Sequence, residues 1–202
     1  MKNAVNLGCG LQTAPGWINL DNSPNILLSK FPTIKWILWK TKLIGDIHYH
    51  TQFPKDVISC ELTKPLPFTN DSMDFVYTSH FLEHLSKDQA KKVLIEIHRI
   101  LKPGGIARIV LPDLFFFINI YLEEKIRHPE IAADNLLTGL NIITKARDPH
   151  LWMYDVPSIV DKLRKIGFEK ITVCEFKKGR CLDVELLDNR PGESLFIEVE
   201  KH

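Results

Sequence analysis

The chain has 202 residues, 45% of them hydrophobic, which is enough for one sizeable buried core and does not require a second domain. Its 26 basic and 25 acidic residues nearly cancel, so no overall charge attracts it to nucleic acid or to an anionic membrane. The N-terminal MKNAVNLGCG has one Lys and no long apolar stretch, unlike a signal peptide or a transmembrane helix, and we expect a cytoplasmic protein. The four widely spaced cysteines are expected to be reduced thiols rather than metal ligands: Cys9, Cys60, Cys174 and Cys181.

Short apolar runs bounded by turns predict the strands of a sheet. In chain order these runs are AVNL, WINLD, DVISCEL, MDFVYTS, GIARIVLP, KITVCEF and SLFIEVE. Apolar residues at helical spacing predict one helix over 90–101, ended by KPGG, and a second in DVPSIVDKLRKIGF, with Asp155 or Ser158 as its N-cap and Gly167 as its end. Strands alternating with amphipathic helices predict an α/β layer sandwich with a mostly parallel sheet, in which the final strands pair antiparallel.

Two stretches depart from this alternation, at residues 23–55 and 114–150, and both are expected to be insertions that could cover the ligand-binding edge of the sheet. The first contains KFPTIKWILWKTKLI, which mixes tryptophans with lysines. It could form a lid over the acceptor, a peripheral membrane contact through 30–44 or a partner surface. In the simplest interpretation the tryptophans pack onto the sheet and the lysines stay solvated.

Two glycines follow the first predicted strand and a carboxylate ends the second. Ligands of open α/β sheets bind beyond the carboxyl ends of the strands, where Gly8 and Gly10 let the backbone approach a ligand closely. Asp21 could accept both hydroxyls of a ribose. A dinucleotide fingerprint would need a third glycine where Thr13 stands and a phosphate-binding helix where Pro15 lies, so a nicotinamide-dependent reductase is disfavoured. The spacing favours a nucleoside without phosphates, such as S-adenosylmethionine.

Three motifs occur in the order NLGCG, LTKPLPFTNDSMDFVYTSHFLEHL and EIHRILKPGGIARIVLPD. Together they resemble the successive motifs of class I S-adenosylmethionine-dependent methyltransferases. They are especially similar to the compact type-11-like branch, in which PGWINLD follows the first glycines almost at once. The later HLWMYDVPSIVDKLRKIGF and SLFIEVE resemble that branch too. The resemblance implies a Rossmann-like three-layer sandwich forming one domain over 1–202, with the insertions at 23–55 and 114–150 capping the active site.

The resemblance also implies a cofactor site for S-adenosylmethionine, with S-adenosylhomocysteine as product. Its implied residues are Gly8, Cys9 and Gly10 under the methionine part, Asp21 at the ribose, Glu61 with Leu62 at the adenine, and Ser79 beside the methionine moiety. Two positions depart from the family pattern. Asn6 stands where many relatives carry an acidic residue, and Glu61 is one methylene longer than the common Asp.

The sulfonium of this cofactor already makes its methyl group electrophilic, so the protein mainly aligns an acceptor behind it. A hydroxyl acceptor would need a base, for which His80 and His150, with Tyr154 nearby, are the candidates. His84 is expected to fix the turn of FLEHL through hydrogen bonds. His48 and His50 resemble a metal pair but lack a third ligand, and no metal is expected.

These observations predict a methyltransferase acting on a small-molecule or carbohydrate-like, glycan-type acceptor, and they disfavour a nucleic acid acceptor. The alternative is a non-catalytic module that binds S-adenosylmethionine or S-adenosylhomocysteine and acts through a protein partner. The identity of the acceptor, the atom methylated and the oligomeric state stay open.

Overall fold

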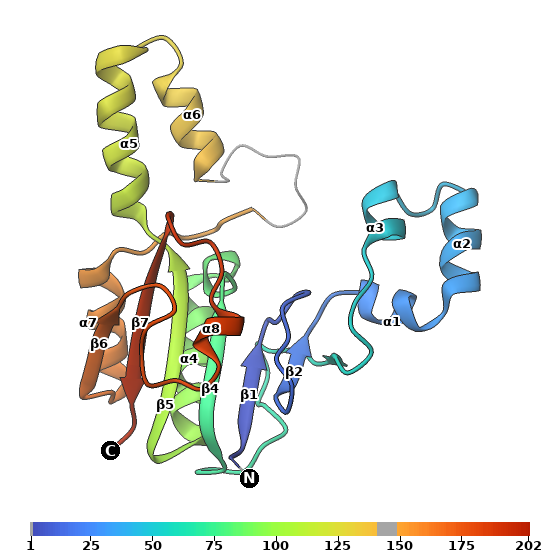
Figure 1. Cartoon of the computed structure of the whole chain (residues 1–202), viewed down its shortest axis with the longest axis horizontal. Helices are drawn as coiled ribbons and strands as arrows, with labels where there is room; N and C mark the ends of the chain where they lie inside the picture. The colour runs from blue at the N-terminus through green and yellow to red at the C-terminus, as the bar shows by residue number, and fades with distance from the viewer. Residues whose placement is uncertain (1, 141–148) are drawn as a thin grey trace.

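The computed structural model describes residues 2–140 and 149–202, and its centre is one seven-stranded sheet (Figure 1). The strands are β1 (Ala4–Leu7), β2 (Ile18–Asp21), β3 (Ile58–Ser59), β4 (Met73–Ser79), β5 (Leu101–Pro112), β6 (Lys170–Cys174) and β7 (Ser194–Glu200). Their order is β3-β2-β1-β4-β5-β7-β6, and β7 runs antiparallel to both of its neighbours while the other pairs are parallel. The predicted mostly parallel sheet with an antiparallel C-terminal strand is confirmed.

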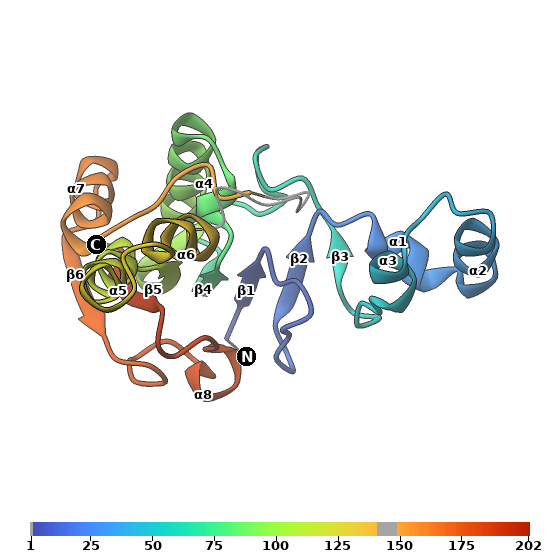
Figure 2. The same cartoon turned by 90° about the horizontal axis from the view of Figure 1, so that it is seen from above.

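The two faces of the sheet are covered differently (Figure 2). The helices are α1 (Asn25–Lys30), α2 (Pro32–Lys40), α3 (Asp46–His50), the 3-10 turn η1 (Leu82–His84), α4 (Lys87–Ile100), α5 (Leu114–Arg127), α6 (Ala132–Gly139), α7 (Val156–Ile166) and α8 (Val184–Leu187). Helices α4 and α7 pack on one face and enclose the main core with the strands. Both are amphipathic and begin in a capping box, and Asp155 caps α7 as expected.

The opposite face is covered by the four-residue helix α8 and by irregular segments rather than by long helices. No helix joins β1 to β2, as Pro15 predicts. The β1–β2 loop is instead tied to the C-terminal part of the chain. The indole Nε1 of Trp17 donates to Asp183 at 2.8 Å, and the Gln12 amide donates to the Leu186 carbonyl at 2.5 Å.

Two predicted strand boundaries differ from the structure. The run DVISCEL contributes only the two paired residues of β3. The KPGG segment ends α4 as predicted but lies within the bounds of β5, because Leu101 already pairs with Met73. Ile106 then pairs with Phe75, so the residues between bulge out of the ladder, where Gly104 adopts a φ of +77°.

The first insertion forms helices α1–α3, which extend beyond the β3 edge of the sheet (Figures 1 and 2). Its tryptophans do not pack on the sheet, in contrast to the simplest interpretation of the sequence. Trp39 stacks on Tyr49 with ring centres 4.3 Å apart, and Trp36 is half exposed. Lys35 is buried, and its ammonium group donates to the Thr51 carbonyl at 2.5 Å.

The second insertion begins with the helical hairpin α5–α6, which rises from the carboxyl end of β5 (Figure 1). Asp113 caps α5 by accepting from the Phe115 amide at 3.0 Å. Residues 141–148 of this insertion lie outside the described residues. Within the parts of the chain that the structure describes, no helix is long and apolar enough to cross a membrane.

Candidate functional site

The cofactor residues expected from the sequence follow strands β1 to β4. Because these strands are parallel, their carboxyl ends meet at one edge of the sheet. The glycine loop follows β1, Asp21 ends β2, Glu61 follows β3 and Ser79 ends β4. The fold therefore brings these residues to one edge.

Backbone geometry explains the two glycines of the loop. Gly8 and Gly10 have φ angles of +68° and +54°, a region that side chains disfavour. A Cβ at Gly8 would lie 2.8 Å from Cγ of Phe81, whereas a Cβ at Gly10 would meet nothing within 4 Å. The loop is pinned to the neighbouring strand, since the amides of Gly8 and Cys9 donate to the Leu20 carbonyl at 2.9 and 3.1 Å. Gly10 thus presents bare backbone to open space.

The carboxylate of Asp21 organises this edge. It accepts from the Gly10 amide at 2.8 Å and from the Ser23 amide at 2.7 Å, one bond to each oxygen. A carboxylate oxygen can accept a second bond, so both can still receive hydroxyl groups. The side chain is partly exposed beside the bare Gly10 backbone. The arrangement fits a ribose diol.

Glu61 lies beside Asp21, to which Asn22 links it. The Asn22 amide donates to Glu61 at 2.9 Å, and the Thr63 hydroxyl donates at 2.7 Å. These bonds, that of Thr63 first, lower the pKa of the Glu61 carboxyl, which keeps it ionised and able to accept from an amino group. Leu62 is buried in the main core, so its side chain serves packing.

Two buried residues, Cys9 and Asn6, contribute to the glycine loop through packing. Cys9 is buried against Ile26, Phe53 and Val57, which join the first insertion to the glycine loop. Burial raises the pKa of the Cys9 thiol to about 12. Asn6, the departure from the family pattern, is also buried and donates to the Gln12 carbonyl at 2.9 Å, within the loop. Both side chains stabilise the loop.

A cavity of about 170 Å³ lies across β4 from the glycine loop. Its lining residues are His80, Pro112, Phe117, Gly139, His150, Arg190 and Glu193. The two candidate bases from the sequence therefore share one cavity, bounded by the ends of β4 and β5 and by helices α5 and α6. Its position beside Ser79 suits an acceptor site.

The two candidate bases have different surroundings. His80 has both ring nitrogens engaged, Nδ1 with the Arg190 guanidinium at 3.0 Å and Nε2 with the Ser194 hydroxyl at 2.8 Å. His150 has a buried Nδ1 without a hydrogen-bond partner among the described residues, and burial lowers its pKa. His150 is therefore neutral at neutral pH, as a base must be.

Three polar residues beside these histidines were not predicted from the sequence: Glu83, Arg190 and Ser194. Glu83 is fully buried, with Oε1 3.4 Å from Nδ1 of His80 and 3.9 Å from Nε2 of His84. His84 does not fix its own turn through its ring, because Nδ1 lies 3.3 Å from the distant Pro149 carbonyl. The apolar neighbours of Glu83 in FLEHL were the available signal for its burial.

His48 and His50 lie two residues apart on α3, where side chains point in different directions. The Nδ1 of His48 lies 3.1 Å from the Asn25 amide, and His50 packs edge-on against Tyr49. The two rings therefore have separate structural contacts.

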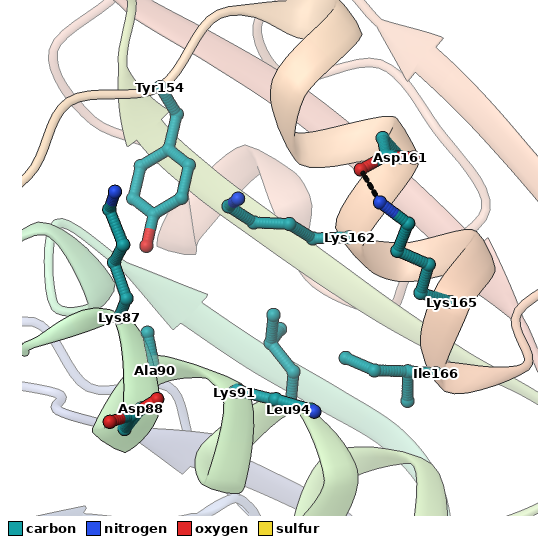
Figure 3. Close-up of a pocket in the computed structure, with 10 residues that line it drawn as sticks. All are labelled: Lys87, Asp88, Ala90, Lys91, Leu94, Tyr154, Asp161, Lys162, Lys165 and Ile166. Atoms are coloured by element: carbon teal, nitrogen blue, oxygen red, sulfur yellow. Dashed lines mark hydrogen bonds and ion pairs between the residues drawn. The ribbon is translucent and has the colours of Figure 1, made fainter.

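A second cavity, of about 260 Å³, lies between α4 and α7 (Figure 3). Four lysines line it, namely Lys87, Lys91, Lys162 and Lys165, and Lys165 pairs with Asp161 at 2.6 Å. The Tyr154 ring enters this cavity from above, so it does not join His150 at the acceptor cavity. None of the residues predicted for the cofactor site lines this space.

Comparisons with known proteins match part of the sequence and the fold. Residues 43–109 match the sequence profile of a family described as a methyltransferase domain. An uncharacterized methyltransferase of Synechocystis is 39% identical over 49 residues, which cover 24% of this chain and 23% of that relative. The chain thus matches less than a quarter of the length of that relative.

Solved structures share the whole fold at low sequence identity. A S-adenosylmethionine-dependent methyltransferase of Archaeoglobus fulgidus matches with a TM-score of 0.55 and 16% identity, covering 99% of this chain and 86% of that one. One from Thermotoga maritima matches with a TM-score of 0.54 and 16% identity, covering 100% and 83%. A Haloferax volcanii complex of a methyltransferase with the Trm112 activator matches with a TM-score of 0.52 and 15% identity, covering 100% and 82%.

S-adenosylmethionine is the cofactor of the methyltransferases that share this fold, and the bare Gly10 backbone beside Asp21 and Glu61 fits it. The chain thus matches a methyltransferase family over residues 43–109 and has the fold of S-adenosylmethionine-dependent methyltransferases.

Proposed function

We propose that the protein transfers a methyl group from S-adenosylmethionine to a hydroxyl of a small-molecule or carbohydrate-like acceptor. The observation that carries the proposal is the meeting of Asp21, Glu61 and the bare Gly10 backbone at one sheet edge. Gly8, Cys9 and Gly10 would lie under the methionine part, Asp21 would bind the ribose, and Glu61 would accept from the adenine amino group. Ser79 would adjoin the methionine moiety, and Leu62 would contribute its backbone.

The acceptor would occupy the cavity that His80 and His150 share. That cavity carries histidine, arginine and carboxylate side chains, a mixture able to hydrogen-bond the hydroxyls of a sugar. His150 is the better base of the two, because its ring is neutral and its Nδ1 is unpartnered within the described ranges. His80, held on both nitrogens, would instead orient the acceptor.

Calorimetric titration with S-adenosylmethionine, S-adenosylhomocysteine and NAD tests the cofactor site. We expect micromolar binding of the first two and none of NAD. In Asp21→Ala, the loss of charged hydrogen bonds worth about 1.5–3 kcal/mol should weaken binding about tenfold or more. Asp88→Ala, which removes an exposed carboxylate on α4, is the matched control and should bind normally. Absence of binding by the unmodified protein would rule out the proposal.

A second candidate is a non-catalytic cofactor-binding module that acts through a protein partner. One observation favours it: apolar side chains on and between α1–α3 are exposed, among them Phe31, Ile34, Trp36, Ile37 and Leu43. This candidate predicts tight S-adenosylhomocysteine binding, no turnover on sugar, nucleotide-sugar or small-metabolite acceptors, and a partner complex that Trp36→Ala abolishes. Methyl transfer to any of these acceptors would decide for the enzyme.

A further inference from the structure

Three side chains with metal-ligating atoms converge at the wall of the acceptor cavity: Glu83, His84 and His150. One ligand atom from each lies within 4.8 Å of the other two. Glu83 and His84 belong to the turn η1 after β4, and His150 lies 66 positions further along the chain. The two segments are joined by backbone bonds, since the amides of Leu151 and Trp152 donate to the Glu83 carbonyl at 2.8 and 3.2 Å. The fold thus assembles the group from distant segments.

This group contains buried polar atoms that have no hydrogen-bond partner within the described residues. Glu83 is 0% exposed, and neither of its carboxylate oxygens has a hydrogen-bond partner among the described residues. The buried Nδ1 of His150 is also unpartnered within the same ranges. An unsatisfied carboxylate in a dry interior is costly, so the arrangement calls for a positive charge.

The tautomer of His84 points a further lone pair at the carboxylate. When Nδ1 of His84 donates to the Pro149 carbonyl, the neutral ring carries its lone pair on Nε2, 3.9 Å from Glu83. The Nδ1 of His80 lies 3.4 Å from the same oxygen, but its lone pair is already engaged when Arg190 donates to it. Two acceptors facing each other repel unless a cation lies between them.

We propose that Glu83, His84 and His150 bind a divalent transition metal ion at the wall of the acceptor cavity. Two imidazoles and one carboxylate suit Zn²⁺ or Mn²⁺ better than Mg²⁺, which prefers an all-oxygen shell. Ligand atoms around tetrahedral Zn²⁺ are about 3.3 Å apart, given metal–ligand bonds of about 2.0–2.2 Å, so the ligand atoms, which lie within 4.8 Å of one another, must close by up to about 1.5 Å. The Pro149 carbonyl would hold the His84 ring in the tautomer that ligates through Nε2.

Three protein ligands leave coordination positions for water or an acceptor oxygen, and His150 belongs to both the metal group and the cavity wall. This part of the inference rests on the proposed function. A metal-bound acceptor hydroxyl releases its proton to solvent more readily. Its oxygen then bonds to the methyl carbon, while the carbon–sulfur bond breaks and leaves its electrons on sulfur. His150 would then be a ligand rather than a free base.

The experiment is calorimetric titration of the chelator-stripped full chain with Zn²⁺, Mn²⁺ and Mg²⁺ in the absence of cofactor. We expect one Zn²⁺ bound with micromolar or tighter affinity, weaker Mn²⁺ binding and no detectable Mg²⁺ binding. Glu83→Gln and His150→Gln should each weaken Zn²⁺ binding at least tenfold. His50→Gln, which removes an exposed histidine on α3, is the matched control and should leave Zn²⁺ affinity unchanged.

Visible absorption of the Co²⁺-loaded protein gives a second measurement that does not depend on the variants folding. Tetrahedral bands at one equivalent of Co²⁺, displaced by Zn²⁺, support the site. Absence of metal binding by the stripped protein would overturn the inference. A proton bound within the group would then balance the charge of Glu83. Binding unchanged in both site variants would also overturn it. Because no cofactor is present, either failure is separate from failure of the Asp21 experiment.

Discussion

Arg108 and Asp188 form an ion pair that is completely buried between β5 and the segment before β7. The Arg108 guanidinium donates to both oxygens of Asp188, at 2.8 Å from Nε and 2.5 Å from Nη2, and a further nitrogen reaches Glu198 at 3.1 Å. Asp188 directly precedes Asn189 and Arg190, whose side chains contact Ser79 and His80. The buried Arg108–Asp188 pair, on the face of the sheet that α8 covers, thus positions Asn189 and Arg190 at the candidate site.

Removing the charge of Asp188 should therefore lower the stability of the fold. In Asp188→Asn the guanidinium of Arg108 keeps its buried charge but loses its closest counterion, and we expect the free energy of unfolding to fall by about 3–5 kcal/mol. Urea denaturation at pH 7 measures it. Asp161→Asn breaks an exposed pair with Lys165 on α7 and should cost no more than about 0.5 kcal/mol. An equal loss of unfolding free energy in Asp188→Asn and Asp161→Asn would contradict the stabilising role of the buried pair.

Gly8→Ala and Gly10→Ala form a matched pair at the cofactor loop. Both alanines must adopt positive φ, at a cost of about 1–2 kcal/mol each. Only Gly8→Ala also collides with the Phe81 ring, so it should unfold at lower urea than Gly10→Ala and lose affinity for S-adenosylhomocysteine through displacement of the loop. The methyl group of Gly10→Ala enters the open space proposed for the cofactor, so this variant should weaken binding with the smaller loss of stability. Adding Phe81→Ala to Gly8→Ala should relieve that collision and recover cofactor affinity. If the double variant binds no better than Gly8→Ala, the collision is not the cause.

Stability should fall as the pH drops below 6.5 partly because of His98. Burial, and then the charge of Lys201, lower the pKa of His98 below its usual 6.5, while Asp71 opposes the shift. Between the folded and unfolded pKa values the unfolded chain binds more protons, so stability is present above pH 6.5 and is lost as pH falls. Urea denaturation at pH 7.5, 6.5 and 5.5 should show a shallower decline for His98→Gln. An unchanged slope would exclude His98 as the group responsible.

The four cysteines should differ in reactivity toward a disulfide reagent at pH 8. Burial raises the pKa of all four thiols, but Cys9 and Cys181 are also inaccessible, whereas Cys60 and Cys174 are partly exposed. We expect slow labelling at Cys60 and Cys174 in the native protein, and labelling of the other two only in guanidinium. Peptide mass spectrometry locates the labels. Fast native labelling of Cys9 would contradict its packing against Phe53.

Much of the fold could be predicted because local signals agree with the tertiary structure. Asp155 and Gly167 bound α7 as their chemistry predicts, and the apolar runs and the period-3.6 patterns place six strands and two helices close to their observed bounds, apart from the early start of β5 at Leu101. The run around Ile58 was the exception. Strand length depends on the neighbouring strand, and β3 pairs with β2 through only two residues.

The positions of the candidate residues could be predicted at the ends of strands, and not where distant segments meet. Gly8, Gly10 and Asp21 predict a nucleoside site because glycines let the backbone approach a ligand and a carboxylate can accept a ribose diol, and this assignment stays a prediction. Glu83 gave no such signal, since its partners His80, His84 and His150 come together only through the packing of the segment after residue 148. Arg190 reaches His80 from a loop positioned by Asp188, a relationship that no local pattern encodes.

The bonds from Trp17 to Asp183 and from Gln12 to Leu186 have a consequence for synthesis on the ribosome. The glycine loop emerges 166 to 174 residues before the segment that holds it in place. Until α8 docks, the loop lacks two of its anchors and the face beneath it stays open to water. Acquisition of S-adenosylhomocysteine binding by a nascent chain would therefore mark the docking of α8 rather than the formation of the first strands.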